Sequence, residues 1–346
     1  MLRVLVLLSS AAVAQTPEAT ALPEEEKLPF VTALHFENDV LAQSDRFYTT
    51  GLRLEHHGEY NPCRKLALAL GFPDTVDHRY PCGVSLSQNI YTPSDITPSE
   101  GETPWPNPED RPYGGWLHAG VLFQHLAAAD SPTRSSRLTL EATVGVTGPA
   151  SGAEHVQRGV HSALRHLFGP DTARDPIGWE AQLPTEPTLH LSALREQPLL
   201  WSPFVDAAWS AGAMLGTVFT NASAGATVRV GWLARPFGLA PLMPSIRQRL
   251  RAEQAPPERT WEAYLFARGQ VRLVARNLFL DGTLFRKSLS VRKTPVVGDT
   301  EVGGAVRTRH FQAALSMVFR SQEMAEPPDS RLGGHRFAQL QLAYLR

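Results

Sequence analysis

Apolar and polar residues alternate along most of this 346-residue chain. In residues 51–57, Leu52 and Leu54 fall on one side of an extended segment, and Arg53 and Glu55 fall on the other. A period of two is typical of β-strands whose two faces meet different surroundings. Turn-forming clusters separate many of these runs. We expect about twelve strands, at residues 30–36, 51–57, 84–90, 116–123, 137–146, 188–194, 200–217, 224–233, 261–273, 284–293, 306–319 and 337–344.

Two all-β architectures fit this pattern. A soluble β-sandwich turns the apolar strand faces inward, whereas an outer-membrane barrel turns them toward lipid and keeps polar side chains inside. Strands of about ten residues and polar alternates such as Arg229 and Arg272 favour an antiparallel transmembrane β-barrel. Aromatic residues near the strand ends favour it as well, namely Trp116, Trp209, Trp232, Tyr264 and Tyr344.

The first residues predict export. A basic start at Arg3, an apolar run at 4–8 and an A-x-A cleavage site at 12–14 make residues 1–14 a secretory signal peptide. Residues 15–28 are rich in Pro, Thr and Glu, which predicts a flexible lead-in. The rest, 29–346, is expected to form one barrel domain.

Charge and cysteine content narrow the possibilities further. The 33 Lys and Arg residues against 34 Asp and Glu residues give a net charge of −1, which disfavours general nucleic-acid binding. No further run of 18 apolar residues follows the signal, which excludes a polytopic helical membrane protein. Cys63 and Cys82, an even pair in an exported chain, are candidates for a disulfide, with two free thiols as the alternative.

One helix interrupts the strand pattern at residues 151–168. Ser151 is the expected N-cap, Glu154 completes a capping box, and Gly169-Pro170 ends the helix. Gln157 and His161 lie one turn apart on the same face. Apolar residues recur at helical spacing on another part of the helix, at Val156, Val160, Leu164 and Leu167.

The densest polar cluster joins the first two strands, at residues 37–39 and 44–51. Carboxylates and amides at such a rim can hold calcium, and they are also the usual content of a hairpin loop rich in Asx turns. His161 is likewise open to two interpretations, a general base or a hydrogen-bonded interface residue. The chain contains no G-x-S-x-G elbow, HExxH motif or P-loop.

Five ordered blocks resemble one family. The run FENDVLAQSDRFYTTGLRL at 36–54 resembles the signature of the outer-membrane lipid A 3′-O-deacylases. Four further blocks are similar to that family in the same order: SQNIYTP at 87–93, DRPYGGW at 110–116, GPASGAEHVQRGVH at 148–161 and GWEAQLPTE at 178–186. Together these blocks cover most of residues 30–190, while the last 150 residues add only the strand pattern.

The resemblance implies a twelve-stranded barrel with its active site on the wall facing the outer leaflet, beside a short helix. It implies calcium-dependent ester hydrolysis that removes the 3′-acyloxyacyl group from lipid A. His161 would be the general base, and Asn38 would polarise the ester carbonyl. Asp39 would lie near the calcium ion. Thr49 and Gln157 would support water or substrate, and Asp171 is a candidate second metal ligand.

The phosphorylated head of lipid A would need cationic partners, and Arg46, Arg64, Lys65 and Arg111 are available, with solvent-facing side chains as the alternative. We expect an outer-membrane protein, a monomer, acting on lipopolysaccharide. The alternative is a barrel that retained the fold without catalysis, with a structural or lipid-binding role.

Overall fold

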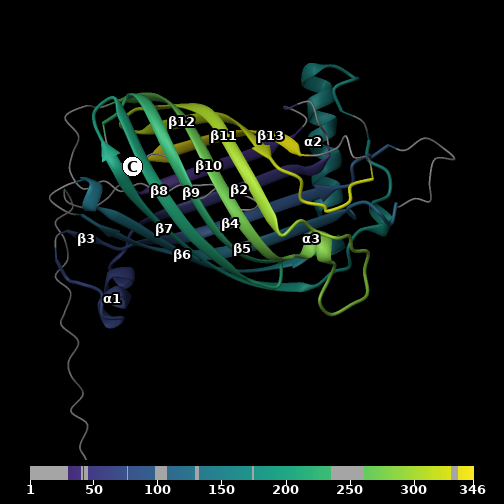
Figure 1. Ribbon diagram of the computed structural model, residues 1–346, viewed down its shortest axis with the longest axis horizontal. Helices are drawn as coiled ribbons and strands as arrows, with labels where there is room; N and C mark the ends of the chain where they lie inside the picture. The colour runs from purple at the N-terminus through teal and green to yellow at the C-terminus, as the bar shows by residue number, and fades with distance from the viewer. Residues whose placement is uncertain are drawn as a thin grey trace, which may run out of the picture.

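The computed structural model describes residues 30–39, 42, 46–75, 77–97, 107–128, 132–173, 175–234, 261–328 and 334–346. The predicted signal peptide and lead-in lie outside these residues. Thirteen strands of the described part form one antiparallel sheet, which closes because β5 also pairs with β6 (Figure 1). The strands are β1 (Val31–Asn38), β2 (Phe47–Glu59), β3 (His78–Arg79), β4 (Pro81–Thr92), β5 (Gly114–Ala127), β6 (Ser136–Thr147), β7 (Pro187–Trp201), β8 (Val205–Gly216), β9 (Phe219–Trp232), β10 (Glu262–Asn277), β11 (Val296–Arg307), β12 (Phe311–Arg320) and β13 (His335–Leu345). Since β3 is two residues long and only extends the edge of β5, the barrel has twelve strands.

The predicted twelve-stranded barrel is confirmed, but two strand predictions were wrong. Residues 284–293 form no named strand: the backbone N–H groups at their start bond to Glu186, and at their end Lys293 forms an isolated bridge with Met324. Residues 306–319 hold the end of β11, a turn and most of β12, and Thr308 N closes that turn on Phe311 O at 2.7 Å. The turn Thr308-Arg309-His310 contains no Gly or Pro, so the sequence carried no signal for it.

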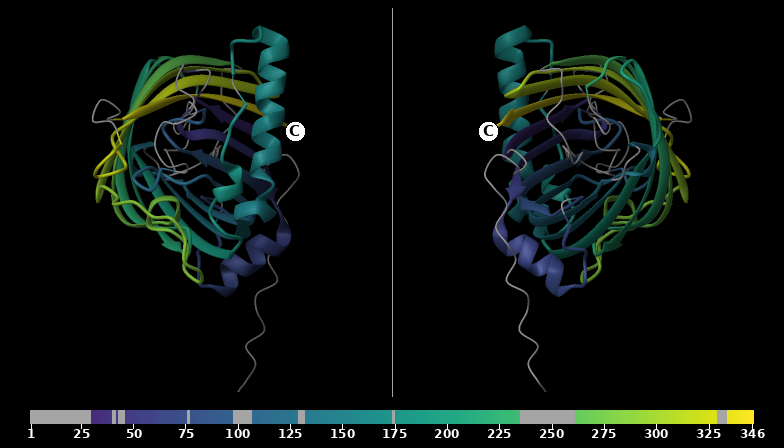
Figure 2. Two further views of the ribbon diagram at one scale, coloured as in Figure 1. Left: turned by 90° about the vertical axis from the view of Figure 1, so that its right-hand side faces the viewer. Right: turned by 90° about the vertical axis from the view of Figure 1, so that its left-hand side faces the viewer.

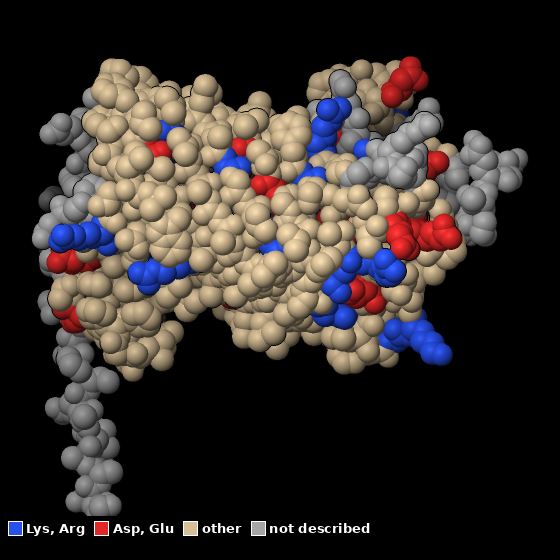
Figure 3. All heavy atoms as spheres, viewed as in Figure 1, with Lys and Arg blue, Asp and Glu red and all other residues tan. Residues whose placement is uncertain are grey.

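The barrel has an apolar outer wall and a polar interior. Outward side chains such as Leu265 and Val121 are 71% and 62% exposed, and Figure 3 shows a wall with few charged side chains across its middle. Inside, buried ion pairs cross between strands, as from Arg268 to Glu301 at 3.1 Å. This arrangement excludes the soluble sandwich. Of the predicted strand-end aromatics, Trp116 and Tyr264 are buried and contribute to the interior, whereas Trp232 and Tyr344 are exposed on the wall.

Short helices mark the two ends of the barrel. The helices α2 (Ala153–Phe168) and α3 (Leu278–Asp281) lie at one end, here called the α2 end, and α1 (Asn61–Ala69) lies at the other (Figures 1 and 2). Single 3-10 turns occur at Pro132–Arg134, Gly148–Ser151 and Trp179–Ala181. None of the helices in the described ranges is long and apolar enough to cross a membrane.

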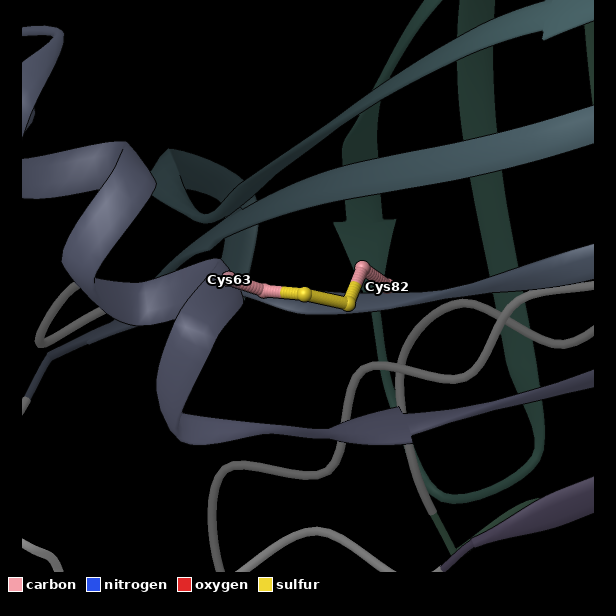
Figure 4. Close-up of a disulfide and its surroundings, with 2 residues drawn as sticks. All are labelled: Cys63 and Cys82. Carbon is pink, nitrogen blue, oxygen red and sulfur yellow. A yellow bond between two sulfur atoms is a disulfide. The ribbon is translucent and has the colours of Figure 1, made fainter.

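The predicted disulfide is present. Cys63 of α1 is joined to Cys82 of β4 (Figure 4). At the α2 end, α3 enters the lumen, where Phe279 stacks on Tyr91 with ring centroids 3.9 Å apart. Asn277 caps this helix by accepting the Phe279 N–H at 3.1 Å. Aromatic and aliphatic side chains therefore fill the barrel at the end where α2 lies.

Candidate active site

A buried polar patch interrupts the apolar outer wall at the α2 end. The register aligns Asn38 of β1 with Thr50, Thr50 with Ile90, and Ile90 with Gly115 of β5. These positions share the outward side of the sheet with Leu52, two residues along from Thr50. Leu52 is 40% exposed, whereas Asn38 and Thr50 are buried. Another part of the chain must therefore cover the wall at this end.

Helix α2 lies on this part of the wall. A Cβ atom at Gly115 would be 2.2 Å from the Cβ of Ala153, so the missing side chain lets the helix approach the strand. The Gln88 side chain of β4 donates from Nε2 to the Ser151 carbonyl at 2.7 Å. The predicted N-cap was wrong: Gly152, at φ 68°, is the N-cap, and the Ser151 hydroxyl instead donates to Gly148 O at 2.6 Å.

The buried face of α2 is polar in its middle. Ala153, Gln157, His161 and Leu164 are its buried residues, and they fall on one stripe. The predicted apolar face is only partly buried, because Leu167 is 70% exposed. Gln157 and His161, which the sequence placed apart from the apolar face, point toward the wall instead.

Helix geometry shows where along the wall these two side chains lie. At about 1.5 Å per residue, Gln157 lies about 6 Å and His161 about 12 Å beyond Ala153. Tilted strands are spaced about 6 Å around a barrel, and α2 runs across the barrel axis rather than along it (Figure 1). Because Ala153 sits on β5, we infer that Gln157 reaches the level of β4 and His161 reaches that of β2.

A β-bulge turns two consecutive threonines of β2 toward α2. Tyr48 pairs with Tyr91 and Thr50 pairs with Ile90, so Thr49 is an extra residue. The Tyr48 side chain points into the barrel, where its hydroxyl donates to Glu37 at 2.6 Å. Thr49 Oγ1 lies 2.7 Å from Thr92 Oγ1, on the outward face that Thr50 also shares. A polar surface thus forms where a regular strand would place one side chain inside.

Asn38 and Asp39 complete this polar surface. Asn38 Nδ2 donates to Thr49 O at 3.1 Å and to Thr50 Oγ1 at 3.2 Å. An ester carbonyl bound by this amide would therefore displace one of those two acceptors. Asp39 is fully buried, and its carboxylate accepts the backbone N–H of Arg46. This bond joins the residue just before β2 to the end of β1.

Trp179 orients Gln157, a contact that the sequence did not predict. The indole Nε1 donates to Gln157 Oε1 at 2.8 Å, and the Trp179 ring packs on Tyr113 with centroids 4.7 Å apart. The bond fixes which end of the Gln157 amide is the donor. Its Nε2 is buried with no hydrogen-bond partner in the described part of the chain. The only signal for Trp179 was its place in the fifth motif block.

The remaining predicted site residues are dispersed. Arg111 is buried inside the barrel, 2.9 Å from Glu323 and within cation–π reach of Tyr91. Lys65 lies on α1 at the opposite end, and its neighbour Arg64 pairs with Asp74. Arg46 is partly buried; its backbone N–H reaches the patch at Asp39, and its guanidinium lies 5.5 Å from the centre of the Phe47 ring. Asp171 is exposed, in the turn that follows α2.

A calcium ion would need more oxygen ligands than the carboxylates at the described part of the patch supply. The described residues contain no group of three His, Cys, Asp or Glu side chains that could hold a metal ion. Calcium takes about six to eight oxygen ligands, usually with several carboxylates. Asp39 offers one carboxylate at the patch, and Asp171 lies beyond the end of α2. We therefore assign no chemical step to a metal ion.

These features define a class of protein. A closed antiparallel barrel with an apolar outer wall, a polar interior and helices at one rim is an outer-membrane β-barrel. Within that class, the chain belongs to the family described as outer membrane protein LpxR, whose model matches residues 1–345. The resemblance seen in the five motif blocks is confirmed.

One solved structure supports the fold. LpxR from Salmonella typhimurium superposes with a TM-score of 0.67 at 19% identity, over 91% of this chain and all of that one. The β domain of the Bordetella autotransporter Brka covers 92% of this chain and 98% of its own, with 10% identity and a TM-score of 0.42. No curated protein matches the chain.

Proposed function

We propose that this barrel is a lipid A deacylase, which hydrolyses the ester that links the 3′-acyloxyacyl group. The observation that carries the proposal is the burial of Gln157 and His161 on the face of α2 that covers a polar patch of an otherwise apolar wall. A lipid in the outer leaflet can reach that wall sideways without entering the barrel. Membership of the LpxR family supports the same activity.

The residues present are sufficient for the acid–base chemistry of ester hydrolysis. The His161 imidazole takes a proton from water as the water oxygen attacks the ester carbonyl carbon. The carbonyl oxygen becomes an oxyanion, and a preorganised N–H donor stabilises it. Gln157 Nε2 is such a donor, because Trp179 holds the other end of the amide. The imidazolium then returns the proton to the leaving sugar oxygen, which releases a carboxylic acid and an alcohol.

Each other group at the patch has a supporting role in this proposal. Thr49 and Thr50 offer hydroxyls to the attacking water, and Asn38 is held beside them. Arg46 would contact a phosphate of the glycolipid, a role supported by the bond of its backbone N–H to Asp39. Calcium dependence, which the family resemblance implies, stays a prediction, with Asp39 as its expected ligand. We further propose that the protein acts as a monomer, since α2 and the patch belong to one chain.

The test is mass spectrometry of purified lipid A after incubation with the detergent-solubilised protein, with calcium or with a chelator. Loss of the 3′-acyloxyacyl unit supports the proposal, and abolition of that loss by the chelator supports the calcium prediction. Unchanged lipid A, from protein that shows the heat-modifiable migration of a folded barrel, would favour the non-catalytic alternative.

A further inference from the structure

A rigid loop tip follows α3 at the α2 end. Two apolar side chains, Leu284 and Phe285, are 49% and 68% exposed there. Two cations, Arg286 and Lys287, come directly after them and are also exposed. Figure 3 shows Lys and Arg side chains gathered over the segment after α3. An apolar pair next to a cationic pair is unusual for a loop that meets only water.

The backbone of this tip is held by one buried carboxylate. Glu186, just before β7, accepts the N–H groups of Leu284, Phe285 and Arg286 at 2.9, 2.7 and 3.1 Å. The loop is also closed on itself, since Thr283 N donates to Ser288 Oγ at 2.9 Å. Three hydrogen bonds to one carboxylate hold the backbone of Leu284, Phe285 and Arg286 in place, which lowers the entropy cost of binding a ligand.

The two cations of the tip are not neutralised within the protein. By contrast, two cations nearby in the chain are paired: Lys293 lies 2.7 Å from Asp281, and Arg292 lies 2.9 Å from Glu326. Arg286 and Lys287 form no ion pair with any residue in the described ranges. The nearest carboxylate in the hydrogen-bond network, Glu186, is occupied by the three backbone donors.

We propose that the tip, Leu284 to Lys287, binds a phosphorylated lipid of the outer leaflet. Arg286 and Lys287 would contact the phosphate, and Leu284 and Phe285 would enter the interface between headgroups and acyl chains. The tip follows α3, whereas the candidate active site lies under α2. The helix α2 follows β6 in the chain, and α3 follows β10. The proposal depends on the outer-membrane fold and not on the proposed hydrolysis.

The experiment uses dodecyl phosphate, which has a phosphate and an alkyl chain but no carboxylic ester. Its binding to the protein in a nonionic detergent is measured by native mass spectrometry, with dodecanol as the uncharged reference. Wild-type protein should prefer dodecyl phosphate. The double substitution Arg286→Glu with Lys287→Glu should weaken that binding about tenfold, because two exposed attractions become repulsions.

Arg309→Glu is the matched control, since Arg309 is also exposed but lies in the β11–β12 turn at the other end. It should bind dodecyl phosphate as the wild type does. The proposal is overturned if dodecyl phosphate and dodecanol bind equally, or if the double variant binds dodecyl phosphate with unchanged affinity. Because the probe contains no ester, this outcome is independent of whether the protein hydrolyses lipid A.

Discussion

At the scale of single residues, the candidate site depends on side chains that hold other side chains. Trp179 fixes the amide of Gln157 through one N–H at 2.8 Å, and the Thr49 bulge presents two hydroxyls in succession. Neither device could be predicted from alternation, because a bulge breaks the period of two and Trp179 is far along the chain from Gln157. The motif blocks did identify Asn38, Thr49, Gln157 and His161, all of which are buried at the α2 end.

The contact from Trp179 to Gln157 gives the first prediction. Trp179→Phe keeps a large ring but removes the donor, so the Gln157 amide is free to turn. We expect kcat for deacylation to fall about three- to tenfold, the cost of one hydrogen bond, with little change in KM. Trp116→Phe is the control, since it loses a similar bond to Thr188, at 2.9 Å, inside the barrel. Equal decreases in kcat in the two variants would show that Trp179 does not act by positioning Gln157.

A second prediction concerns the acid stability of the Arg111–Glu323 pair. Burial alone would raise the pKa of Glu323, but Arg111 and Arg320 outweigh it and hold that pKa well below its usual range. A lowered folded-state pKa adds stability above the unfolded value of about 4.3 and loses it as the pH falls. Glu323→Gln should therefore weaken the barrel at neutral pH and flatten its loss of stability on acidification.

The measurement is the thermal unfolding midpoint followed from neutral pH down through about pH 3. Glu326→Gln serves as the control, because Glu326 forms an exposed pair with Arg292, and such pairs contribute little. A Glu323→Gln profile that runs parallel to the wild-type profile would contradict the assignment.

At the scale of elements, α2 depends on the absence of a side chain in β5. The sequence predicted the helix and its end at Gly169. The N-cap differs from the prediction because Gly148–Ser151 form a 3-10 turn, and the buried stripe differs because the helix packs on a polar wall instead of an apolar core. Helical spacing shows which residues share a face, but it does not show which face a neighbouring element covers.

The close packing of α2 on β5 gives the third prediction. Gly115→Ala places a methyl group 2.2 Å from Ala153 Cβ and 2.2 Å from Ser151 Oγ, so the start of α2 must move away from β5. Overpacking of this kind costs about 1–3 kcal/mol. We expect deacylation to fall about tenfold or more while the barrel stays folded, because His161 moves with the helix.

Gly269→Ala is the matched control, since a Cβ at Gly269 of β10 meets nothing within 4 Å. Activity and folded migration are measured for both variants. Full activity in folded Gly115→Ala protein would show that the position of α2 does not matter for the reaction.

At the scale of the whole molecule, the pattern of the strands determined the architecture. Outward leucines and valines alternate with inward arginines, glutamates and glutamines, and the closed sheet follows from that alternation. The boundary between β11 and β12 was missed because its turn has no Gly or Pro. The position of Arg111 was also missed, since a cation near a rim and a cation inside the lumen have the same local sequence pattern.

The disulfide gives the fourth prediction, because it lies at the end opposite α2. The bridge spans 19 residues and joins α1 to β4, and in the chain-entropy model such a loop contributes about 3 kcal/mol. Replacing Cys63 and Cys82 together with Ala should lower the thermal unfolding midpoint and leave deacylation of folded protein unchanged. Loss of activity in the folded variant would mean that the two ends of the barrel are coupled.

The most direct test of the site compares two histidines of the same helix. His161 is buried against the wall, whereas His155 is exposed on the opposite side of α2. Lipid A is incubated with His161→Ala and with His155→Ala protein, each shown to migrate as a folded barrel, and the products are weighed by mass spectrometry. We predict that His155→Ala releases the 3′-acyloxyacyl unit as the wild type does and that His161→Ala releases none. Release by the His161→Ala protein at the wild-type rate would contradict the assignment of His161 as the base and of this site as the place of the reaction.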